Sequence, residues 1–400
     1  MESSKAQKYG FASYDFSNSG FVIIFQSFLF PIVLNEALNG SKNDYLWPAI
    51  VTISSILAVI AAPFIGRMAD HHGKAKVFAT TVIVTALLAA IGPVFLSSSA
   101  LLLAILFVIF NLFFELSQSL YDSFLVNFEK TVKGITNLSS FAWGFGYLGG
   151  SLFVGLYLLF EKMGLGTTLS LFIFGLLYLL LSVPSMRSFK KLSPSVKTQS
   201  LSFREYLRVK PPVPWRDLVI YWLIADVVTA ILYFAPLYLQ QDIGLSLSAV
   251  GALLLGGQIL AFPMTLIVGR VANRIGQLKA IRWSLLIWAL GIFGLVLAEN
   301  IYHLIPVIIL LSFVLGSTQS LMRAHFGSRI HERGSGESFG FFAIAQKSAS
   351  IVSPALVLLT TLIFEGFQVA FFVLGIILCI AFFVSRYLPH PEENHAIPVE

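Results

Sequence analysis

Residues 66–76, Gly-Arg-Met-Ala-Asp-His-His-Gly-Lys-Ala-Lys, decide the fold of this chain, because they recur at 269–279 as Gly-Arg-Val-Ala-Asn-Arg-Ile-Gly-Gln-Leu-Lys. Each copy follows an apolar stretch. A second pair of segments matches at nearly the same spacing: residues 118–122 read Gln-Ser-Leu-Tyr-Asp and residues 319–323 read Gln-Ser-Leu-Met-Arg. Two matched pairs in corresponding places predict an internal repeat.

The composition predicts a membrane protein. The chain has 400 residues, of which 57% are hydrophobic and 12% charged, whereas about a quarter of an ordinary soluble domain is charged. A bilayer core requires about 20 apolar residues per helical span. We predict twelve spans, and they are 11–34, 46–66, 76–97, 100–121, 139–160, 166–186, 216–239, 248–268, 279–298, 302–322, 339–363 and 367–387.

These spans predict an all-α membrane protein with two parallel six-helix repeats. An even number of spans in each repeat gives both copies the same orientation in the membrane. The predicted domains are an N-terminal bundle over 1–186, a linker over 187–215 and a C-terminal bundle over 216–400. Residues 203–209 of the linker are expected to form a short surface helix or to stay a plain tether. The segment around 66–76 is expected to be a loop between spans two and three.

The charge distribution predicts the orientation. Of the 26 Lys and Arg residues, only Lys42 and Lys162 fall in outer loops and Lys347 falls inside a span. The positive-inside rule therefore places both termini in the cytoplasm. This asymmetry accounts for the net charge of +6 without a nucleic-acid partner. The short loops favour a bacterial inner membrane, and a monomer is expected.

Several patterns resemble a known family. The segment 66–76 is similar to the signature of the major facilitator superfamily, with His71 and His72 in place of two basic residues. Residues 14–19, 140–150, 316–319 and 337–341 resemble the bacterial branch related to the yeast vacuolar amino-acid effluxer linked to autophagy. The chain departs from this branch at Asp122 and Met322. The resemblance implies a transporter fold, amino-acid substrates and no cofactor. It also implies that Asp70 bonds the N-terminus of a helix in the other half.

Polar side chains inside the spans are costly, so they mark candidate substrate or proton sites. Helical spacing places sets of them on shared faces of spans one, four, seven and ten. The candidates for substrate or proton binding are Asp15, Asn18, Gln26, Glu115, Gln118, Trp143, Tyr147, Trp222, Asp226, Thr229, Tyr233, Gln319, Gln346 and Lys347. The candidates for gating are Arg67, Asp70, Asp122 and Arg323.

Each candidate has a structural alternative. Lys347 is either a ligand for an anionic group or the ion-pair partner of Glu115 or Asp226. Asp122 and Arg323 form a gate or lie at the membrane surface. Asp226 is expected to face a polar cavity rather than lipid. The adjacent histidines 71 and 72 lack a third ligand, so no metal site is predicted.

The leading hypothesis is a proton-coupled secondary transporter of a small polar or zwitterionic metabolite, with an amino acid favoured. The alternatives are an uncoupled facilitator, an importer of peptides or metal-chelating metabolites, and a transport-inactive receptor or scaffold. The chain contains no Gly-rich nucleotide loop followed by Lys-Ser/Thr. His303 and His325 are isolated in the sequence, so no catalytic cluster is predicted and an enzyme is not expected.

Overall fold

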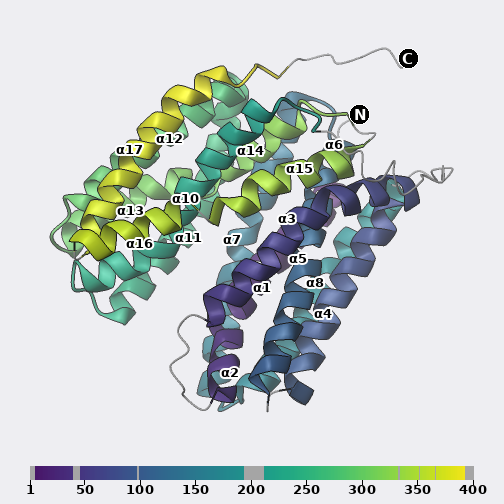
Figure 1. Cartoon of the computed structure of the whole chain (residues 1–400). Coiled ribbons are helices and arrows are strands. Elements are labelled where there is room, and N and C mark those ends of the chain that lie inside the picture. Colours follow the sequence, from purple (N-terminus) through teal and green to yellow (C-terminus); the bar gives the residue numbers. More distant parts are fainter. Residues whose placement is uncertain are drawn as a thin grey trace. The chain divides into compact units, whose positions relative to one another are not determined.

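The computed structural model describes residues 5–38, 46–96, 99–192, 211–331, 334–350, 352–364 and 366–391, and within them every regular element is a helix (Figure 1). Among these described residues, ten helical stretches are long and apolar enough to cross a membrane. They correspond to predicted spans two to ten and twelve, except that several extend beyond the predicted bounds. The major interruptions fall in spans one and eleven.

The helices of the first half follow the prediction closely. They are α3 (Leu46–His72), α4 (Lys74–Leu96), α5 (Ala100–Ser123), α6 (Leu125–Phe128), α7 (Val132–Lys162) and α8 (Thr167–Leu192). Those of the second half are α10 (Trp215–Gln241), α11 (Leu247–Ile275), α12 (Gln277–Val296), α13 (Ile301–Leu315), α14 (Ser317–Gly327) and α17 (Gln368–Val384), followed by the 3-10 turn η3 (Ser385–Tyr387).

The repeated motif is mostly helical, so the expectation of a loop over 66–76 was wrong. Helix α3 continues to His72, and only Gly73 separates it from α4. Gly73 has φ of 103°, and Gly276, at the same place in the second copy, has φ of 94°. Residues with a side chain rarely adopt this conformation, so glycine at both positions permits an abrupt turn between two spans.

Span one contains α1 (Lys5–Phe21), a π-helical segment η1 (Val22–Phe28) and α2 (Leu29–Ala37). A π turn inserts extra residues relative to an α-helix, so side chains after Val22 are rotated from the face expected for an unbroken helix. Gln26 lies within this π segment, and its place on one face with Asp15 and Asn18 remains a prediction. Span eleven contains α15 (Ser335–Lys347), a 3-10 turn η2 (Ser348–Ser350) and α16 (Val352–Phe364).

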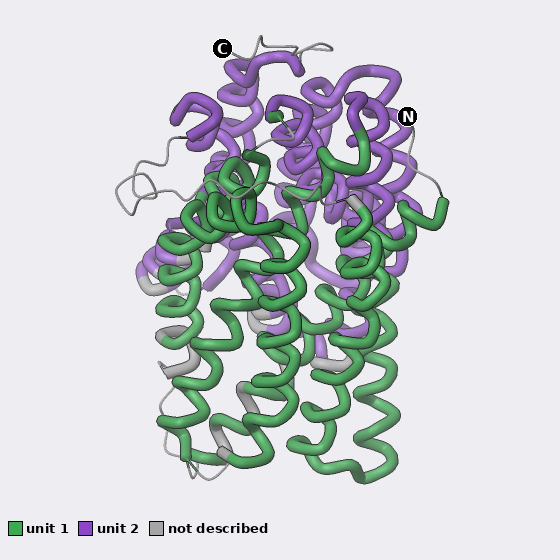
Figure 2. Tube along the Cα trace, turned by 90° about the vertical axis from the view of Figure 1, so that its right-hand side faces the viewer, with its two compact units in different colours: residues 1–129, 145–210, 331–344 green, residues 130–144, 211–330, 345–400 purple. Residues whose placement is uncertain are grey.

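The chain divides into two compact units, coloured in Figure 2. Unit 1 contains residues 1–129, 145–210 and 331–344, and unit 2 contains 130–144, 211–330 and 345–400. The first part of α7 thus belongs to unit 2 and the first part of α15 to unit 1. The predicted division into halves at 187–215 does not include this exchange. Residues 193–210, with the predicted surface helix, lie outside the described part of the chain.

Each unit has its own packed core. In unit 1, α8 packs against α1 and α4, and α5 packs against α3 and α4; Phe124 stacks on Phe189 with ring centroids 4.0 Å apart. In unit 2, α12 packs against α13 and α17, and Tyr238 of α10 stacks on Phe371 at 4.8 Å. Many Leu and Ile side chains on the long helices remain exposed, as expected where a helix faces lipid.

Candidate functional site

The repeated motif of unit 1 binds the start of α15. Asp70, in the last turn of α3, accepts hydrogen bonds from the backbone N–H groups of Gly336 (3.0 Å) and Glu337 (2.9 Å). A carboxylate at this place satisfies N–H groups that have no partner within their own helix, and it interacts favourably with the helix dipole. Arg67 forms an ion pair with the Glu337 side chain at 3.5 Å. We call this group of contacts the α15 clasp.

Two glycines allow the helices of the α15 clasp to meet. A Cβ added at Gly66 would overlap the carbonyl of Gly336, and one added at Gly336 would overlap the Gly66 carbonyl and the Asp70 carboxylate. The backbones of α3 and α15 therefore approach more closely than side chains would permit. The glycine that opens the motif has a steric role in addition to flexibility.

Lys74 completes the α15 clasp, and the prediction of site residues omitted it. Its buried ammonium donates hydrogen bonds to Ser335 Oγ (2.6 Å), Asn127 Oδ1 (2.7 Å) and the Ser123 carbonyl (3.3 Å). It also lies 4.8 Å from the centre of the Phe124 ring. Lys74 directly follows Gly73, the glycine of the turn. The family signature has a basic residue at this position. That position is the signal from which it could have been predicted.

The second copy of the motif makes matching contacts within unit 2. Asn273 Nδ2 donates to Asn137 Oδ1 at 2.6 Å, and Gln277 Nε2 donates to Thr136 Oγ1 at 2.8 Å. Asn273 corresponds to Asp70 and Gln277 to Lys74, and they hold the start of α7 as Asp70 and Lys74 hold the start of α15. The repeat in the sequence is thus also a repeat of contacts. The charged groups of unit 1 are replaced by neutral amides in unit 2.

Arg323 of α14 belongs to this second group of contacts. Its side chain is completely buried, and its guanidinium donates to Ser139 Oγ (2.9 Å) and to the Ser139 carbonyl (3.0 Å). It also lies 5.1 Å from the centre of the Trp143 ring, so it positions a predicted substrate residue on α7. Asp122, its predicted gating partner, is buried in unit 1. The gate between the two charges remains a prediction.

Unit 1 contains a chain of polar groups beside the π-helical segment. Gln26 Nε2 donates to Asn111 Oδ1 at 2.7 Å, and Asn111 Nδ2 donates to Ser54 Oγ at 2.8 Å. These residues come from η1, α5 and α3. Single π turns often occur at functional sites. Gln26 was predicted as a site residue. Asn111 and Ser54, which were not in the predicted set, connect it to two further spans.

The other unit 1 candidates are buried within the spans. Asp15, Glu115 and Gln118 are each less than one-tenth exposed, and Tyr147 is half-buried. Among the described residues, the buried oxygens Asn18 Oδ1 and Gln118 Oε1 have no hydrogen-bond partner. Buried polar groups are normally satisfied by protein, water or ligand. Asn18 and Gln118 remain predicted site residues, and the buried Ser119 Oγ of the same unit, which was not predicted, also has no partner among the described residues.

The unit 2 candidates fall into two groups. Asp226 is only 1% exposed, and its Oδ2 accepts hydrogen bonds from the backbone N–H (2.8 Å) and hydroxyl (2.5 Å) of Ser353. Trp222 Nε1 donates to the Ser348 carbonyl at 3.3 Å. Asp226 is thus buried against α16, and its exposure to a polar cavity remains a prediction. The remaining candidates are half-buried or exposed, and they are Thr229, Tyr233, Gln319, Gln346 and Lys347.

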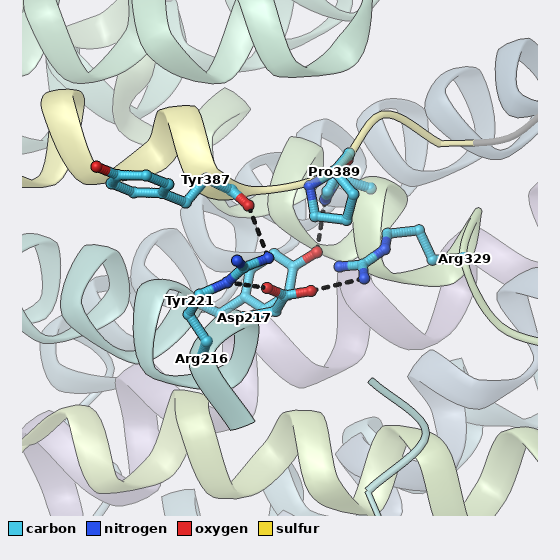
Figure 3. Close-up of polar contacts among 7 residues, drawn as sticks. Arg216, Asp217, Tyr221, Arg329, Tyr387 and Pro389 are labelled. Carbon is cyan, nitrogen blue, oxygen red and sulfur yellow. Dashed lines mark hydrogen bonds and ion pairs between the residues drawn. The ribbon is translucent and has the colours of Figure 1, made fainter. Parts of the chain in front are cut away.

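A polar network around the buried Asp217, at the start of α10, was not predicted from the sequence (Figure 3). Asp217 accepts a hydrogen bond from Arg329 at 2.7 Å and forms a second ion pair with its neighbour Arg216 at 3.2 Å. Arg216 also donates to the Tyr387 carbonyl at 3.1 Å. The network therefore ties the segment after α17 to the start of α10.

His325 extends this network. Its Nδ1 lies 2.5 Å from the hydroxyl of Tyr221, and its Nε2 lies 3.0 Å from the Pro389 carbonyl. Because a carbonyl only accepts, Nε2 carries the proton. The histidine was judged isolated because its partners are distant in the sequence. No group of three His, Cys, Asp or Glu side chains that could hold a metal occurs among the residues described.

The long apolar helices, the repeated motif and the polar side chains buried within the spans together define a polytopic membrane protein of the transporter type. The family model "Major Facilitator Superfamily" matches residues 16–354 and 218–400, and the chain belongs to this superfamily. It is therefore a multi-pass membrane transporter rather than an enzyme.

Known relatives agree with this assignment. The chain is 24% identical over 420 aligned residues to the uncharacterised transporter YxiO of Bacillus subtilis (strain 168), covering 96% of this chain and 95% of that protein. Its fold is similar to that of a bacterial homologue of the iron transporter ferroportin in an outward-facing state, with 18% identity and a TM-score of 0.75, covering 96% of this chain and 99% of that one.

Two further solved structures share the fold. The human organic anion transporter TETRAN has 14% identity and a TM-score of 0.74, and the match covers 96% of this chain and 100% of that one. The proton:xylose symporter XylE has 13% identity and a TM-score of 0.70, covering 97% of this chain and 96% of that one. The names of these proteins refer to different substrates, so the shared fold does not identify the substrate of this chain.

Proposed function

We propose that this protein is a proton-coupled secondary transporter that moves a small zwitterionic metabolite, with an amino acid as the favoured substrate, across a bacterial cytoplasmic membrane. The observation that carries the proposal is the set of buried polar groups in unit 1. Asp15 and Glu115 supply carboxylates, and Asn18 and Gln118 supply amide oxygens with no partner among the described residues. Such acceptors suit a substrate ammonium group.

Lys347 favours the same substrate class, because its ammonium group suits a substrate that carries a carboxylate. It is half-buried in unit 2 and is the last residue of α15, and a second cationic side chain, Arg323, is buried in the same unit. Charged groups inside spans are retained where they serve transport or form pairs. The resemblance to the branch of the yeast vacuolar amino-acid effluxer also supports this substrate class. The transport cycle would use alternating access, as proposed for transporters with parallel repeats.

Purified protein in proteoliposomes tests the substrate class. We expect uptake of radiolabelled amino acids from a mixed pool when a pH gradient is imposed, and substantially less uptake without the gradient. Equal uptake under both conditions would favour an uncoupled facilitator. Failure to move any amino acid, with movement of dipeptides or metal-chelating metabolites instead, would contradict the proposed class. Absence of transport for all three groups would favour a receptor or scaffold.

The proton carrier is tested by Asp226→Asn. The amide is permanently neutral but keeps an oxygen that accepts a hydrogen bond from Ser353. If Asp226 carries the proton, the variant should lose gradient-driven accumulation and retain exchange of substrate across the membrane. Both are measured on the same proteoliposomes.

Two results would contradict this role. Normal accumulation by Asp226→Asn would leave Asp15 and Glu115 as the candidates. Poor expression that a second change, Lys347→Met, restores would indicate a structural ion pair instead.

A further inference from the structure

Span eleven is interrupted in the middle of an apolar stretch. Helix α15 ends at Lys347, one 3-10 turn covers Ser348–Ser350, and α16 begins at Val352. The end of one helix leaves backbone carbonyls without an intrahelical partner, and the start of the next leaves N–H groups without one. Such groups are costly at membrane depth unless other parts of the protein satisfy them.

One face of α10 satisfies both sides of this interruption. Trp222 Nε1 donates to the carbonyl of Ser348, on the α15 side, at 3.3 Å. Asp226 accepts from the N–H of Ser353, on the α16 side, at 2.8 Å. Residues four apart in a helix lie on the same face. Trp222, a donor, and Asp226, an acceptor, thus lie one turn apart on α10. They meet a carbonyl before the break in span eleven and an N–H group after it.

The interruption lies close to the boundary between the two units. Residues up to Ile344 belong to unit 1 and those from Ala345 to unit 2. The start of α15 is bound within unit 1 by Asp70 and Lys74. The segment from Ser348 onward is bound within unit 2 by α10. Each end of span eleven therefore has its own anchor, and the helix is broken where the anchoring changes.

We propose that span eleven is jointed at Ser348–Ser350 and that Trp222 and Asp226 form a brace that holds this joint. Asp226 is then a positioning residue of the transport cycle, in addition to any part it has in proton coupling. The joint permits the α15 segment to follow unit 1 while α16 follows unit 2. Changes in domain arrangement are usually absorbed at a few such positions. The role in transport rests on the proposed function, but the brace itself is measured without any substrate.

The same helix provides a matched control. Asp242, the residue after α10, accepts hydrogen bonds from the N–H groups of Phe367 (2.7 Å) and Gln368 (2.9 Å), at the start of α17. Asp226, in α10, and Asp242, at its end, thus make the same kind of contact, in which a carboxylate oxygen accepts from an N–H group at the start of another helix. Asp242 is exposed and binds the start of an uninterrupted span, whereas Asp226 is buried at the joint.

The experiment measures the distance across the joint in lipid nanodiscs. The single native cysteine is replaced by Cys379→Ser, and spin labels are attached at His331→Cys and Leu359→Cys, both exposed positions on opposite sides of the joint. Pulsed electron paramagnetic resonance then compares the parent with Asp226→Ala, Trp222→Phe and Asp242→Ala. We expect the first two substitutions to shift or broaden the distance distribution and Asp242→Ala to leave it unchanged.

Transport is measured in parallel on the same variants. Asp226→Ala should lower it about tenfold or more, the effect of leaving a buried N–H group without its acceptor. Asp242→Ala should stay within about twofold of the parent, as for other surface changes. If Asp226→Ala does not fold, Trp222→Phe carries the test, because it removes one hydrogen bond and retains the aromatic packing.

The outcomes separate the two proposals. An unchanged distance distribution in both brace variants overturns the brace, even if transport is lost, and leaves Asp226 as a proton or substrate group. The same distribution change in Asp242→Ala as in Asp226→Ala also overturns it. A change confined to the brace variants, in a protein that moves no amino acid, supports the brace and contradicts the proposed substrate class.

Discussion

Asp70 and Lys74 bind the start of α15 with opposite charges from neighbouring positions on two helices. Asp70 accepts from backbone N–H groups, and Lys74 donates to a hydroxyl, an amide oxygen and a carbonyl. The corresponding residues in unit 2, Asn273 and Gln277, make neutral contacts. The α15 clasp is therefore the group of contacts that is more sensitive to loss of a charge.

Substitution of Asp70 by Asn should weaken the α15 clasp. The amide retains one acceptor oxygen for two N–H groups and loses the charge at the helix terminus, a contact worth about 0.3–2 kcal/mol. We expect cysteines introduced along α7 and α15 to show changed labelling from the two sides of the membrane. His72→Ala, at an exposed neighbouring position, is the control. Unchanged labelling together with normal transport would show that Asp70 has no gating role.

Substitution of Lys74 by Met should destabilise unit 1. The change leaves three acceptors, two of them buried, without this donor, and each unsatisfied buried group costs about 1–3 kcal/mol. Thermal melting in detergent should show a clearly lower transition temperature than for Lys76→Met, at an exposed position of the same helix. Equal transition temperatures for the two variants would mean that the Lys74 contacts contribute no net stability.

At the scale of whole helices, α7 illustrates how glycines set the distance between spans. A Cβ added at Gly149 would overlap the carbonyl of Phe16 on α1, and one added at Gly146 would meet Ser19. Small residues permit such close helix packing in membranes. These contacts show that Gly146 and Gly149 are needed for the packing of α7 against α1.

Gly149→Ala should therefore destabilise the packing of α7 against α1 by about 1–3 kcal/mol, the typical cost of overpacking. Gly155→Ala is the matched control, since nothing lies within 4 Å of its added Cβ. Alanine there should be neutral or stabilising by up to about 1 kcal/mol, because it replaces glycine within a helix. Thermal melting of the two purified variants tests the difference. A larger loss at position 155 than at 149 would contradict it.

At the scale of the whole molecule, the positive charges predict the orientation. Only two Lys residues, Lys42 and Lys162, fall in predicted outer loops. The test uses a phosphatase that is active only outside the cytoplasm. We expect it to be inactive when fused after Glu400 and active when inserted after Met163. The two fusions control for each other's expression. The reverse pattern would show that both termini lie outside and that the orientation is wrong.

The sequence alone determined the fold class and the position of most spans. Apolar stretches of the required length are a local property, and the membrane permits few structures other than helices. The repeated Gly-Arg motif also indicated the family. The resemblance to the family signature in turn implied the helix terminus that Asp70 binds. Trp222 and Asp226 could be placed on one helix face from their spacing alone.

Only the tertiary structure decided which partners these side chains have. The π turn after Phe21 and the exchange of 130–144 and 331–344 between the units leave no periodic pattern in the sequence. Ser353 as the partner of Asp226, and Pro389 as that of His325, come from segments far along the chain. Helix formation depends on nearby residues, whereas a buried polar side chain is satisfied by whatever the packing of distant helices brings beside it.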